Sequence, residues 1–268
     1  MKQHTETVEF LKENGFINAE IGIVLGTGLG GIINSLEIIK ELDYAAIPNF
    51  PQATVESHKG KLILASYAGK RIILMQGRFH FYEGYSMQQI VFPIQVFKLL
   101  GVAKLFISNA AGAVNLEFKK GELMLIEDHI NLLPDNPIRG KNLDELGPRF
   151  PDMSAPYNIE LNKELIEIAN QLNIKLNRGV YTSVMGPNLE TRAEYKFLKI
   201  IGTDAVGMST VPEVIAANHC KLPCCAISVL TDECDPLNLH PVELSEIIRI
   251  AGIAEQDLIK LFLKKKKK

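Results

Sequence analysis

The sequence predicts an α/β fold, a single domain in which helices flank a central mixed β-sheet. Short apolar runs, typical of strands covered on both faces, alternate along the chain with segments of helical periodicity. Two of these runs lie close enough together to form an antiparallel hairpin. The 268 residues, 47% of them hydrophobic, would fit one domain or two small ones, and no change in composition marks a linker. We therefore expect one domain over residues 1–268, with a lysine-rich tail at about residues 264–268.

The first predicted element is a buried strand that runs into a glycine-dense turn, in the segment IGIVLGTGLGG at residues 21–31. Glycine has no Cβ to restrict positive φ, so successive backbone amides of such a turn can converge on an anion. Thr27 adds a hydroxyl donor. The simplest ligand for this turn is phosphate, free or esterified.

The same turn also fits the dinucleotide-binding fingerprint, through Gly26, Gly28 and Gly31. That interpretation needs a second parallel strand that ends in an acidic residue roughly 20 positions further on. The chain there reads LEIIKELDYAAIPNFPQ, with prolines at positions 48 and 51. A nicotinamide-dependent dehydrogenase is therefore a disfavoured alternative.

The remaining strands and helices are predicted in alternation. Apolar runs predict strands at residues 62–67, 71–75, 104–108, 123–128, 179–184, 204–208 and 225–230. Helical periodicity predicts helices at residues 86–100, 159–172, 191–201, 212–221 and 242–263. Polar, glycine-rich or charged clusters follow several strands directly, and in open α/β sheets ligand groups gather beyond the carboxyl ends of the strands. These clusters predict one composite pocket.

Several of the clusters carry side chains or amides suited to phosphate. Arg78 and His80 lie two residues apart in QGRFHFYEG, so in extended chain they face the same side. A guanidinium can bind phosphate bidentately and an imidazole can add a donor. An isolated pair of this kind is more simply a surface arginine and a half-buried histidine. Phosphate binding is nevertheless favoured, because Thr27 and Ser209 offer further hydroxyl donors after other strands. The small neighbours of Ala110 also leave its amide accessible to an anion.

Two acidic residues each allow two interpretations. Glu190, in GPNLETRAE, could be a solvated residue of a first helical turn, where the helix dipole favours it. It could instead accept N–H bonds from a flat heterocycle. Asp232, in LTDECD, could be an ordinary turn residue or the group that meets the other edge of that heterocycle.

Composition excludes several classes of partner. The net charge of −2 gives no indication of nucleic acid binding. The N-terminus lacks an apolar signal core, and no stretch of 18 uncharged apolar residues suggests a membrane span. The four cysteines contain no C-x-x-C pair, so we expect reduced thiols, no metal and a cytoplasmic protein; they are Cys220, Cys224, Cys225 and Cys234.

Taken together, the clusters resemble the trimeric class of purine nucleoside phosphorylases, including its methylthioadenosine phosphorylase relatives. The resemblance covers about residues 20–262 and is carried, in the family's order, by GTGLG, ESHKGKL, QGRFHFYEGY, SNAAGAVN, DHINLLPDNPIRG, RFPDMS, GPNLETRAE and AVGMSTVPEV. It implies a single α/β domain that assembles as a homotrimer with active sites shared between subunits. It also implies a pentosyltransferase that uses inorganic phosphate to cleave (deoxy)inosine and (deoxy)guanosine into free purine and (deoxy)ribose 1-phosphate, without a metal or organic cofactor.

The resemblance also implies roles for individual residues. The phosphate ligands would be Thr27, His58, Arg78, His80, Ala110 and Ser209, with His58 on a loop that closes over the phosphate. The nucleoside contacts would be Tyr82, Phe150, Leu189, Glu190, Met208, Asp232 and His240. Phe150 would reach into the sugar site of the neighbouring subunit. Catalysis would depend on His80, Glu190 and Asp232.

The chain departs from the family pattern at the residues expected to contact the base. Asp232 stands where the 6-oxopurine enzymes carry Asn; this looks like the methylthioadenosine branch, although the second acid, Asp235, comes one residue later than in that branch. Glu190 suits the N1–H and 2-amino groups of hypoxanthine and guanine and would meet the bare N1 of adenine unfavourably. Because we give Glu190 more weight than Asp232, we predict that the substrates are inosine and guanosine. This prediction requires that Asp232 is protonated when it donates to N7, or that it acts through water.

The sequence leaves two further activities open. A phosphorylase of methylthioadenosine or other 6-aminopurine nucleosides is the first, and a non-catalytic nucleoside sensor on the same scaffold is the second.

The family has a histidine near the 5′-hydroxyl of the sugar. Counting back from Gly252 places Ser245 at that position, and His240 lies five residues earlier. Leu189 stands where many relatives carry Phe, which would replace ring stacking by aliphatic packing.

Overall fold

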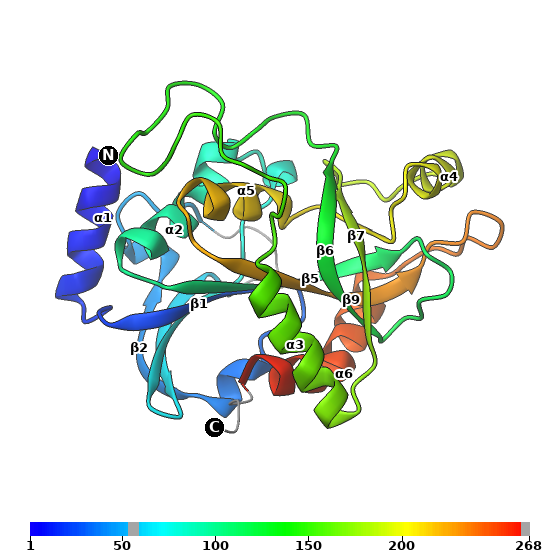
Figure 1. Ribbon diagram of the computed structural model, residues 1–268, viewed down its shortest axis with the longest axis horizontal. Coiled ribbons are helices and arrows are strands. Elements are labelled where there is room, and N and C mark those ends of the chain that lie inside the picture. The colour runs from blue at the N-terminus through cyan, green and yellow to red at the C-terminus, as the bar shows by residue number, and fades with distance from the viewer. Residues whose placement is uncertain (53–58, 264–268) are drawn as a thin grey trace.

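The computed structural model describes residues 1–52 and 59–263, and within them nine strands form one mixed sheet with helices on both faces (Figure 1). The strand order is β2-β3-β4-β1-β5-β8-β7-β6-β9. The strands are β1 (Ala19–Leu25), β2 (Glu37–Asp43), β3 (Lys61–Tyr67), β4 (Lys70–Gln76), β5 (Lys104–Ala113), β6 (Leu123–Asn131), β7 (Leu176–Ser183), β8 (Ala205–Gly207) and β9 (Cys224–Glu233). The helices are α1 (Lys2–Glu13), α2 (Met87–Leu99), α3 (Ile159–Leu172), α4 (Arg192–Ile200), α5 (Val211–His219) and α6 (Leu244–Leu263).

The elements predicted from the apolar pattern are confirmed, each close to its observed bounds. The hairpin is confirmed too, since β3 and β4 pair in antiparallel register from Lys61 with Gln76 to Tyr67 with Lys70. The sequence did not predict α1 or β2. Most residues of β2 are exposed, and it pairs with β3 in antiparallel fashion at the edge of the sheet. It is therefore not the parallel second strand that a dinucleotide-binding fold requires.

The strand β5 belongs to two parts of the sheet. Its first half pairs in parallel with β1, and it pairs with β9 along nearly its whole length. Its last residues, Gly112 and Ala113, pair with β8. Because β9 also pairs with β6, the strands β5, β8, β7, β6 and β9 close into a ring. β5 thus joins this ring to the open sheet formed by β2, β3, β4 and β1.

Two hydrophobic cores lie on the two faces of the sheet. Successive side chains of a strand point to opposite faces. In β1, Val24 is buried in the core that includes α2 and α5, whereas Ile23 and Leu25 are buried in the core that includes α3 and α6. Burial on both sides explains why these strands appear in the sequence as continuous apolar runs rather than as alternating patterns.

The glycine-rich turn after β1 lies directly against β5. A Cβ on Gly26 would be 2.7 Å from the Cα of Asn109 and 2.9 Å from the carbonyl oxygen of Ser108, so only glycine allows this approach. The Gly26 amide donates to Ser108 Oγ at 3.2 Å, and Ser108 Oγ donates to the Val24 carbonyl at 3.3 Å. These contacts hold the turn that carries Thr27 against the middle of β5.

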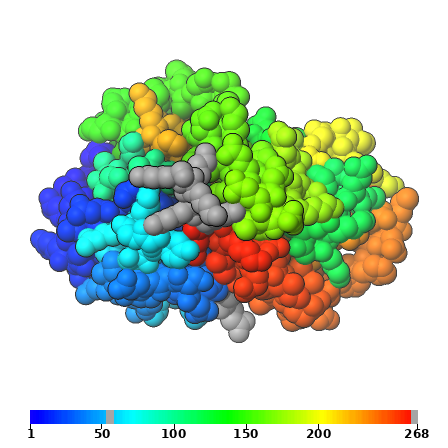
Figure 2. All heavy atoms as spheres, turned by 60° about the horizontal axis from the view of Figure 1, so that its bottom comes forward, coloured from blue at the N-terminus to red at the C-terminus, as the bar shows by residue number. Residues whose placement is uncertain are grey.

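The other side of the turn is held by α6, which lies between α3 and the short 3₁₀ helix Gly31–Ser35 (Figure 2). The carboxylate of Glu255 on α6 accepts hydrogen bonds from the amides of Gly31, at 2.6 Å, and Ile32, at 3.4 Å. Burial raises the pKa of Glu255. The amide of Gly31 is thus bound by a side chain of the protein itself.

Gly26→Ala should lower the thermal unfolding midpoint, because the added methyl group meets backbone atoms of β5 that cannot rotate away. Overpacking of this kind costs about 1–3 kcal/mol, and each kcal/mol shifts Tm by about 2–4 °C in a chain of roughly this size. Gly252→Ala in α6 is the matched control, since a Cβ there meets nothing within 4 Å. Circular dichroism checks this, and a Tm for Gly26→Ala equal to that of the unmodified protein would contradict the close approach.

Candidate functional site

The loops that follow β1, β4, β7 and β8 meet the last residues of β9 and the second half of β5 around a cavity of about 320 Å³. All of the clusters from which the pocket was predicted contribute to its lining. Of the residues proposed for a site from the sequence, the cavity brings together Thr27, Arg78, His80, Tyr82, Ala110, Leu189, Glu190, Met208, Ser209 and Asp232.

Arg78 is the centre of the first polar group in the cavity. Its side chain is 2% exposed, and its Nε forms an ion pair with Glu213 Oε1 at 3.1 Å. Its Nη1 donates to Ser209 Oγ at 3.0 Å. The loop that carries Arg78 is held at its base, because the Tyr44 hydroxyl donates to the Gly77 carbonyl at 2.8 Å. A fully buried guanidinium is therefore fixed by a carboxylate on one side and presented to the cavity beside a hydroxyl.

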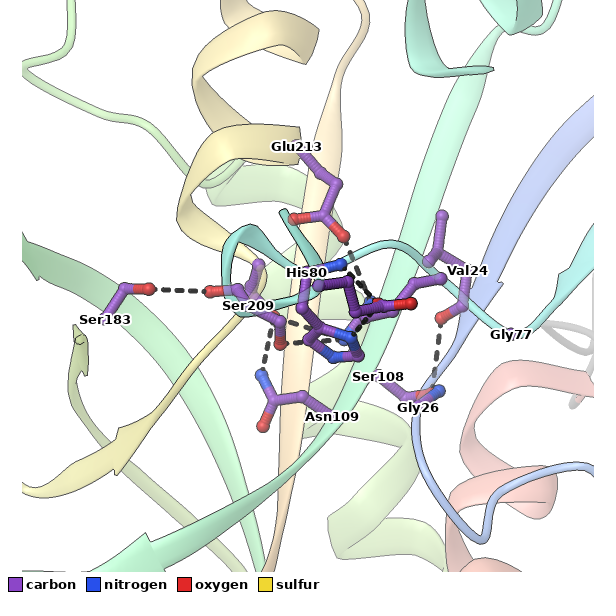
Figure 3. A network of polar contacts seen from close by, with 12 residues as sticks. Val24, Gly26, Gly77, His80, Ser108, Asn109, Ser183, Ser209 and Glu213 are labelled. Atoms are coloured by element: carbon purple, nitrogen blue, oxygen red, sulfur yellow. Dashed lines mark hydrogen bonds and ion pairs between the residues drawn. The ribbon is translucent and has the colours of Figure 1, made fainter. Parts of the chain in front are cut away.

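Ser209 and Thr210 lie in the turn between β8 and α5, and Figure 3 shows Ser209 beside Ser183. The Ser209 amide donates to the Tyr181 hydroxyl at 3.3 Å, and Ser183 Oγ donates to the Ser209 carbonyl at 3.1 Å. Thr210 has a positive φ of 72°, and its Oγ1 accepts from Asn109 Nδ2 at 2.8 Å. Thr210 occupies the N-cap position of α5 but forms no side-chain cap; its hydroxyl instead accepts from Asn109 and, at 3.5 Å, from Arg78 Nη1.

Asn109 leaves one atom for a ligand. Its Oδ1 is buried and has no hydrogen-bond partner among the residues that the structure describes. Buried polar atoms in proteins are almost always hydrogen-bonded. A donor carried by a bound molecule would satisfy this oxygen.

His80 is oriented by Glu83. Glu83 Oε1 lies 2.9 Å from His80 Nδ1 and accepts the His80 backbone amide at 2.8 Å, and the imidazole ring stacks on Tyr82 with 4.7 Å between centroids. Burial lowers the pKa of His80, although the Glu83 carboxylate acts in the opposite direction. With a proton on Nδ1 directed at Glu83, a neutral His80 has an acceptor at Nε2 and can donate there only when protonated. The sequence alone indicates His80 simply as a donor.

The second polar group consists of two carboxyl groups. Asp232 lies at the end of β9, where its Oδ1 accepts from Thr231 Oγ1 at 2.9 Å. Glu190 lies in the loop before α4 and is half-buried. Burial raises the pKa of Glu190, and the nearby charge of Asp232 adds to that effect. Leu189 and Met208 supply apolar surface to the same cavity.

Two predicted site residues, Phe150 and His240, do not line this cavity. Phe150 is 87% exposed and does not line the cavity. His240 is exposed and lines an adjoining cavity that shares Thr231 and Asp232 with the first. His58 lies outside the described residues.

The helix α6 contributes different residues from those expected. Ser245, the alternative to His240 near the sugar, is exposed, and its hydroxyl donates to Glu243 at 3.4 Å. The residues of α6 that line the cavity are instead Leu244 and Ile247.

Several residues that shape the site are not evident from the sequence. Glu83 carries a weak indication, since an acid three residues after His80 is a capping pattern. The local pattern marks Glu213 only as a first-turn residue of a helix, and its partner is 135 positions away along the chain, Arg78. Tyr195 belongs to the apolar face of α4, where nothing in the pattern indicates a pocket.

The described residues form no cluster of three or more His, Cys, Asp or Glu side chains that could hold a metal ion. None of the helices in residues 1–52 and 59–263 combines the length and the apolar character needed to cross a lipid bilayer.

Comparison with known proteins places this chain in a family. A family model described as the phosphorylase superfamily matches residues 20–265. The chain is 45% identical over 262 residues to purine nucleoside phosphorylase 1 of Bacillus subtilis, covering 97% of each chain. It is also similar to a crystal structure of isoform 2 of purine nucleoside phosphorylase from Schistosoma mansoni in complex with cytosine and ribose-1-phosphate. The TM-score is 0.93 and the identity 39%, covering 97% of this chain and 94% of that chain.

The α/β fold with an anion-suited group and a carboxyl pair in one cavity is thus of the nucleoside phosphorylase type. The chain belongs to the phosphorylase superfamily and, within it, to the purine nucleoside phosphorylase family.

Glu213→Ala should reduce the free energy of unfolding by about 3–5 kcal/mol, because it leaves the buried Arg78 without its counter-charge. The double variant Arg78→Met with Glu213→Leu should be close to the unmodified protein, since replacing both charges by apolar groups removes the desolvation cost. Urea unfolding measures both. Glu160→Ala, which breaks an exposed ion pair with Lys163, is the control and should change stability by less than about 1 kcal/mol. If Glu213→Ala lowered the free energy of unfolding as little as Glu160→Ala does, the Arg78–Glu213 ion pair would not be important for stability.

Proposed function

We propose that the protein uses inorganic phosphate to cleave the N-glycosidic bond of inosine, guanosine and their deoxy forms, giving free purine and (deoxy)ribose 1-phosphate. The observation that carries this proposal is a single cavity lined by both the Arg78 group and the Glu190–Asp232 pair. A reaction between an anion and a heterocyclic nucleoside needs both kinds of group in one space. The Bacillus subtilis relative, similar over nearly its whole length, is named for this activity.

In this proposal, phosphate binds beside Arg78, Ser209, Thr27 and the Ala110 amide, and His80 completes the contacts. The guanidinium and the Ser209 hydroxyl, already 3.0 Å apart, can both turn donors toward the anion. α5 begins two residues after Ser209, so the positive end of its dipole adds to the attraction. The contribution of His58 stays a prediction.

The chemistry follows from the position of the anion relative to the sugar. As the C1′–N9 bond breaks, positive charge develops on the sugar and the electron pair departs with the purine. Phosphate beneath C1′ stabilises that positive charge and then forms the new C1′–O bond, so positioning and electrostatics supply most of the rate. A neutral His80 can accept a proton from phosphate or from a sugar hydroxyl at Nε2. No organic cofactor or metal takes part in this scheme.

At the base, Glu190 is proposed to accept the N1–H of hypoxanthine or guanine, and Asp232 to meet N7. A hydrogen bond to N7 makes the purine a better leaving group. Losing one preorganised donor of this kind typically costs about 10²-fold or more in rate. Leu189 and Met208 would cover the ring and the sugar, together with Tyr82.

One alternative activity has specific support, and a second is disfavoured. A 6-aminopurine nucleoside phosphorylase is favoured by Asp232, and a Schistosoma mansoni purine nucleoside phosphorylase, 35% identical with a TM-score of 0.92 over 100% of this chain and 98% of that one, is described in complex with adenosine. A nucleoside sensor would use the same fold, but it has little reason to keep both the Arg78 group and the carboxyl pair.

We also propose the homotrimer that the family resemblance implies, and a cytoplasmic location. The exposed position of Phe150 supports the trimer, because a ring that is 87% exposed contributes little to the core of its own protomer, where Arg149 lies over it at 5.7 Å from the centroid. In a trimer it would enter the sugar site of the neighbouring subunit.

A coupled assay tests the proposed reaction directly. Inosine, guanosine, adenosine and methylthioadenosine are each offered with and without phosphate. We expect hypoxanthine and guanine to be released only when phosphate is present. Faster turnover of methylthioadenosine than of inosine would overturn the 6-oxopurine preference. Nucleoside binding without any phosphate-dependent product would favour the sensor, and a rise in Tm with NAD would favour the dehydrogenase.

Phe150→Ala should lower kcat/KM for inosine by about 10- to 100-fold, because burying a phenylalanine against a ligand contributes about 1.5–3 kcal/mol. The melting temperature of the protomer should not fall, since the side chain is exposed. Ile200→Ala, at 83% exposure on α4, is the control and should leave kcat/KM unchanged. Light scattering should report a trimer, and a fully active monomer would refute the shared site.

A further inference from the structure

A second cavity, of about 380 Å³, lies apart from the candidate functional site. Most of its lining comes from the start of α1, the helix α2 and the loop 137–143, and His219 at the end of α5 adds to it. Figure 1 shows the green loop that contains residues 137–143 beside the N-terminal end of α1. Among the described residues, the two cavities share none of their lining. This space is therefore separate from the one that Arg78 and Glu190 line.

Hydrogen bonds between the surrounding segments fix the shape of this second cavity. Gln88 Nε2 on α2 donates to the carbonyl of Arg139 at 3.2 Å, which ties α2 to the loop. On the α5 side, His219 Nε2 lies 3.2 Å from Asn142 Oδ1. Asn142 also donates from Nδ2 to the Gly147 carbonyl at 2.9 Å. The walls of the cavity are therefore held by the protein itself.

The buried part of the lining carries hydrogen-bonding and aromatic side chains. His4 and Gln95 are each 7% exposed, and His4 Nε2 lies 2.8 Å from Gln95 Oε1. An amide oxygen can only accept, so His4 is the donor in this contact. Gln95 Nε2 donates to no residue in the described parts of the chain. The buried ring of Phe92 lies beside His4, with 4.7 Å between ring centroids. This part of the cavity thus offers both an N–H donor and a flat apolar surface.

The exposed part of the lining is basic. It contains Arg139 and Lys141, and no acidic side chain lines the cavity among the residues that the structure describes. Asp135 binds the Nε and Nη2 groups of Arg139, at 2.5 and 3.3 Å, which leaves Nη1 for a ligand. Three acids contact lining side chains without lining the cavity themselves; they are Glu6, Asp135 and Asp144. An anion that enters therefore meets two cationic donors and no carboxylate of the lining.

A ligand that fits these features carries both a flat heterocycle and an anion. A glutamine amide can donate to a heterocycle and accept from it, and an aromatic ring can stack on its face. A guanidinium and an ammonium both bind phosphate. If the cavity of about 320 Å³ takes a nucleoside and phosphate, as in the proposed function, the larger second cavity has room for the two joined in one molecule. Phosphate alone would leave the buried part of the cavity without contacts.

We propose that this cavity is a second binding site of the protein and that it takes a nucleoside 5′-monophosphate. The base lies against Phe92 and forms a hydrogen bond with Gln95, and the phosphate contacts Arg139 and Lys141. The comparison of sizes rests on the proposed function, whereas the arguments from charge and from hydrogen bonding do not. No bond is made or broken at this site, so the proposal adds a ligand and not a reaction.

Isothermal titration calorimetry with guanosine 5′-monophosphate tests the proposal on the full-length protein, without inorganic phosphate so that no cleavage occurs. The titrated protein carries Glu190→Gln, which removes a carboxylate acceptor from the first cavity. We expect one guanosine 5′-monophosphate to bind per protomer. Guanosine alone and ribose 5-phosphate alone should each bind about tenfold more weakly or worse, because each keeps only part of the contacts.

Matched variants locate the bound nucleotide. Arg139→Gln with Lys141→Gln, added to Glu190→Gln, removes both cations of the second cavity and should weaken binding about tenfold or more. Lys163→Gln with Lys175→Gln, in the same background, is the control. It removes the same amount of charge from exposed ion pairs outside both cavities and should leave the affinity unchanged. Circular dichroism checks the folding of each variant, and Lys141→Gln alone decides the matter if the double variant does not fold.

The outcomes are distinct from those that bear on the proposed function. Binding that is lost with Glu190→Gln, or that is unchanged by Arg139→Gln with Lys141→Gln, would overturn the second site. An equal loss in the control would overturn it too, because general charge attraction would then explain the binding. Equal affinity for ribose 5-phosphate would overturn the assignment of a nucleotide. None of these results bears on the phosphate-dependent cleavage of inosine, which the coupled assay decides separately.

Discussion

The buried ion pair between Arg78 and Glu213 is the interaction on which the rest of the site depends. A guanidinium at this depth without a counter-charge would cost several kcal/mol. The pair joins the loop after β4 to the first turn of α5, two segments far apart in the chain. Ser209 and Thr210 accept hydrogen bonds from the same guanidinium, and Asn109 on β5 donates to Thr210. One pair of opposite charges thus brings three separate segments of the chain to the same wall of the cavity.

The electrostatics of the cavity differ between its two polar groups. The positive charge of Arg78 is balanced within the protein, so an incoming anion meets donors and a helix terminus more than a bare cation. The carboxyl groups of Glu190 and Asp232 line the same cavity and can accept hydrogen bonds from ligands with N–H groups. A nucleoside with an anion beside its sugar can form hydrogen bonds with both the Arg78 group and the two carboxyl groups. The nucleoside alone or the anion alone can bind only one of them.

Much of this fold could be predicted because the central strands are buried on both faces and appear as unbroken apolar runs. The strand β2 could not be predicted, since an exposed edge strand has no such pattern. The closure of the ring of strands β5, β8, β7, β6 and β9 could not be predicted either, because it depends on pairings between distant segments that no local sequence pattern indicates. In the cavity, Arg78 and Ser209 were predictable because they follow strands directly. Glu213 was not, because a glutamate in a first helical turn has the same local pattern whether it faces solvent or a buried arginine.

The position of β5, shared between the open sheet and the ring, also determines which molecules are long enough for the cavity. Asn109 contacts the Arg78 group through Thr210, and Gly112 faces Asp232. Three residue steps of extended strand join these points, or about 10 Å at roughly 3.3 Å per residue. This stretch of β5 is paired with β9, so the spacing between the two polar groups of the cavity is set by the backbone of the sheet. A compact metabolite that matches only one group would leave the other in contact with water.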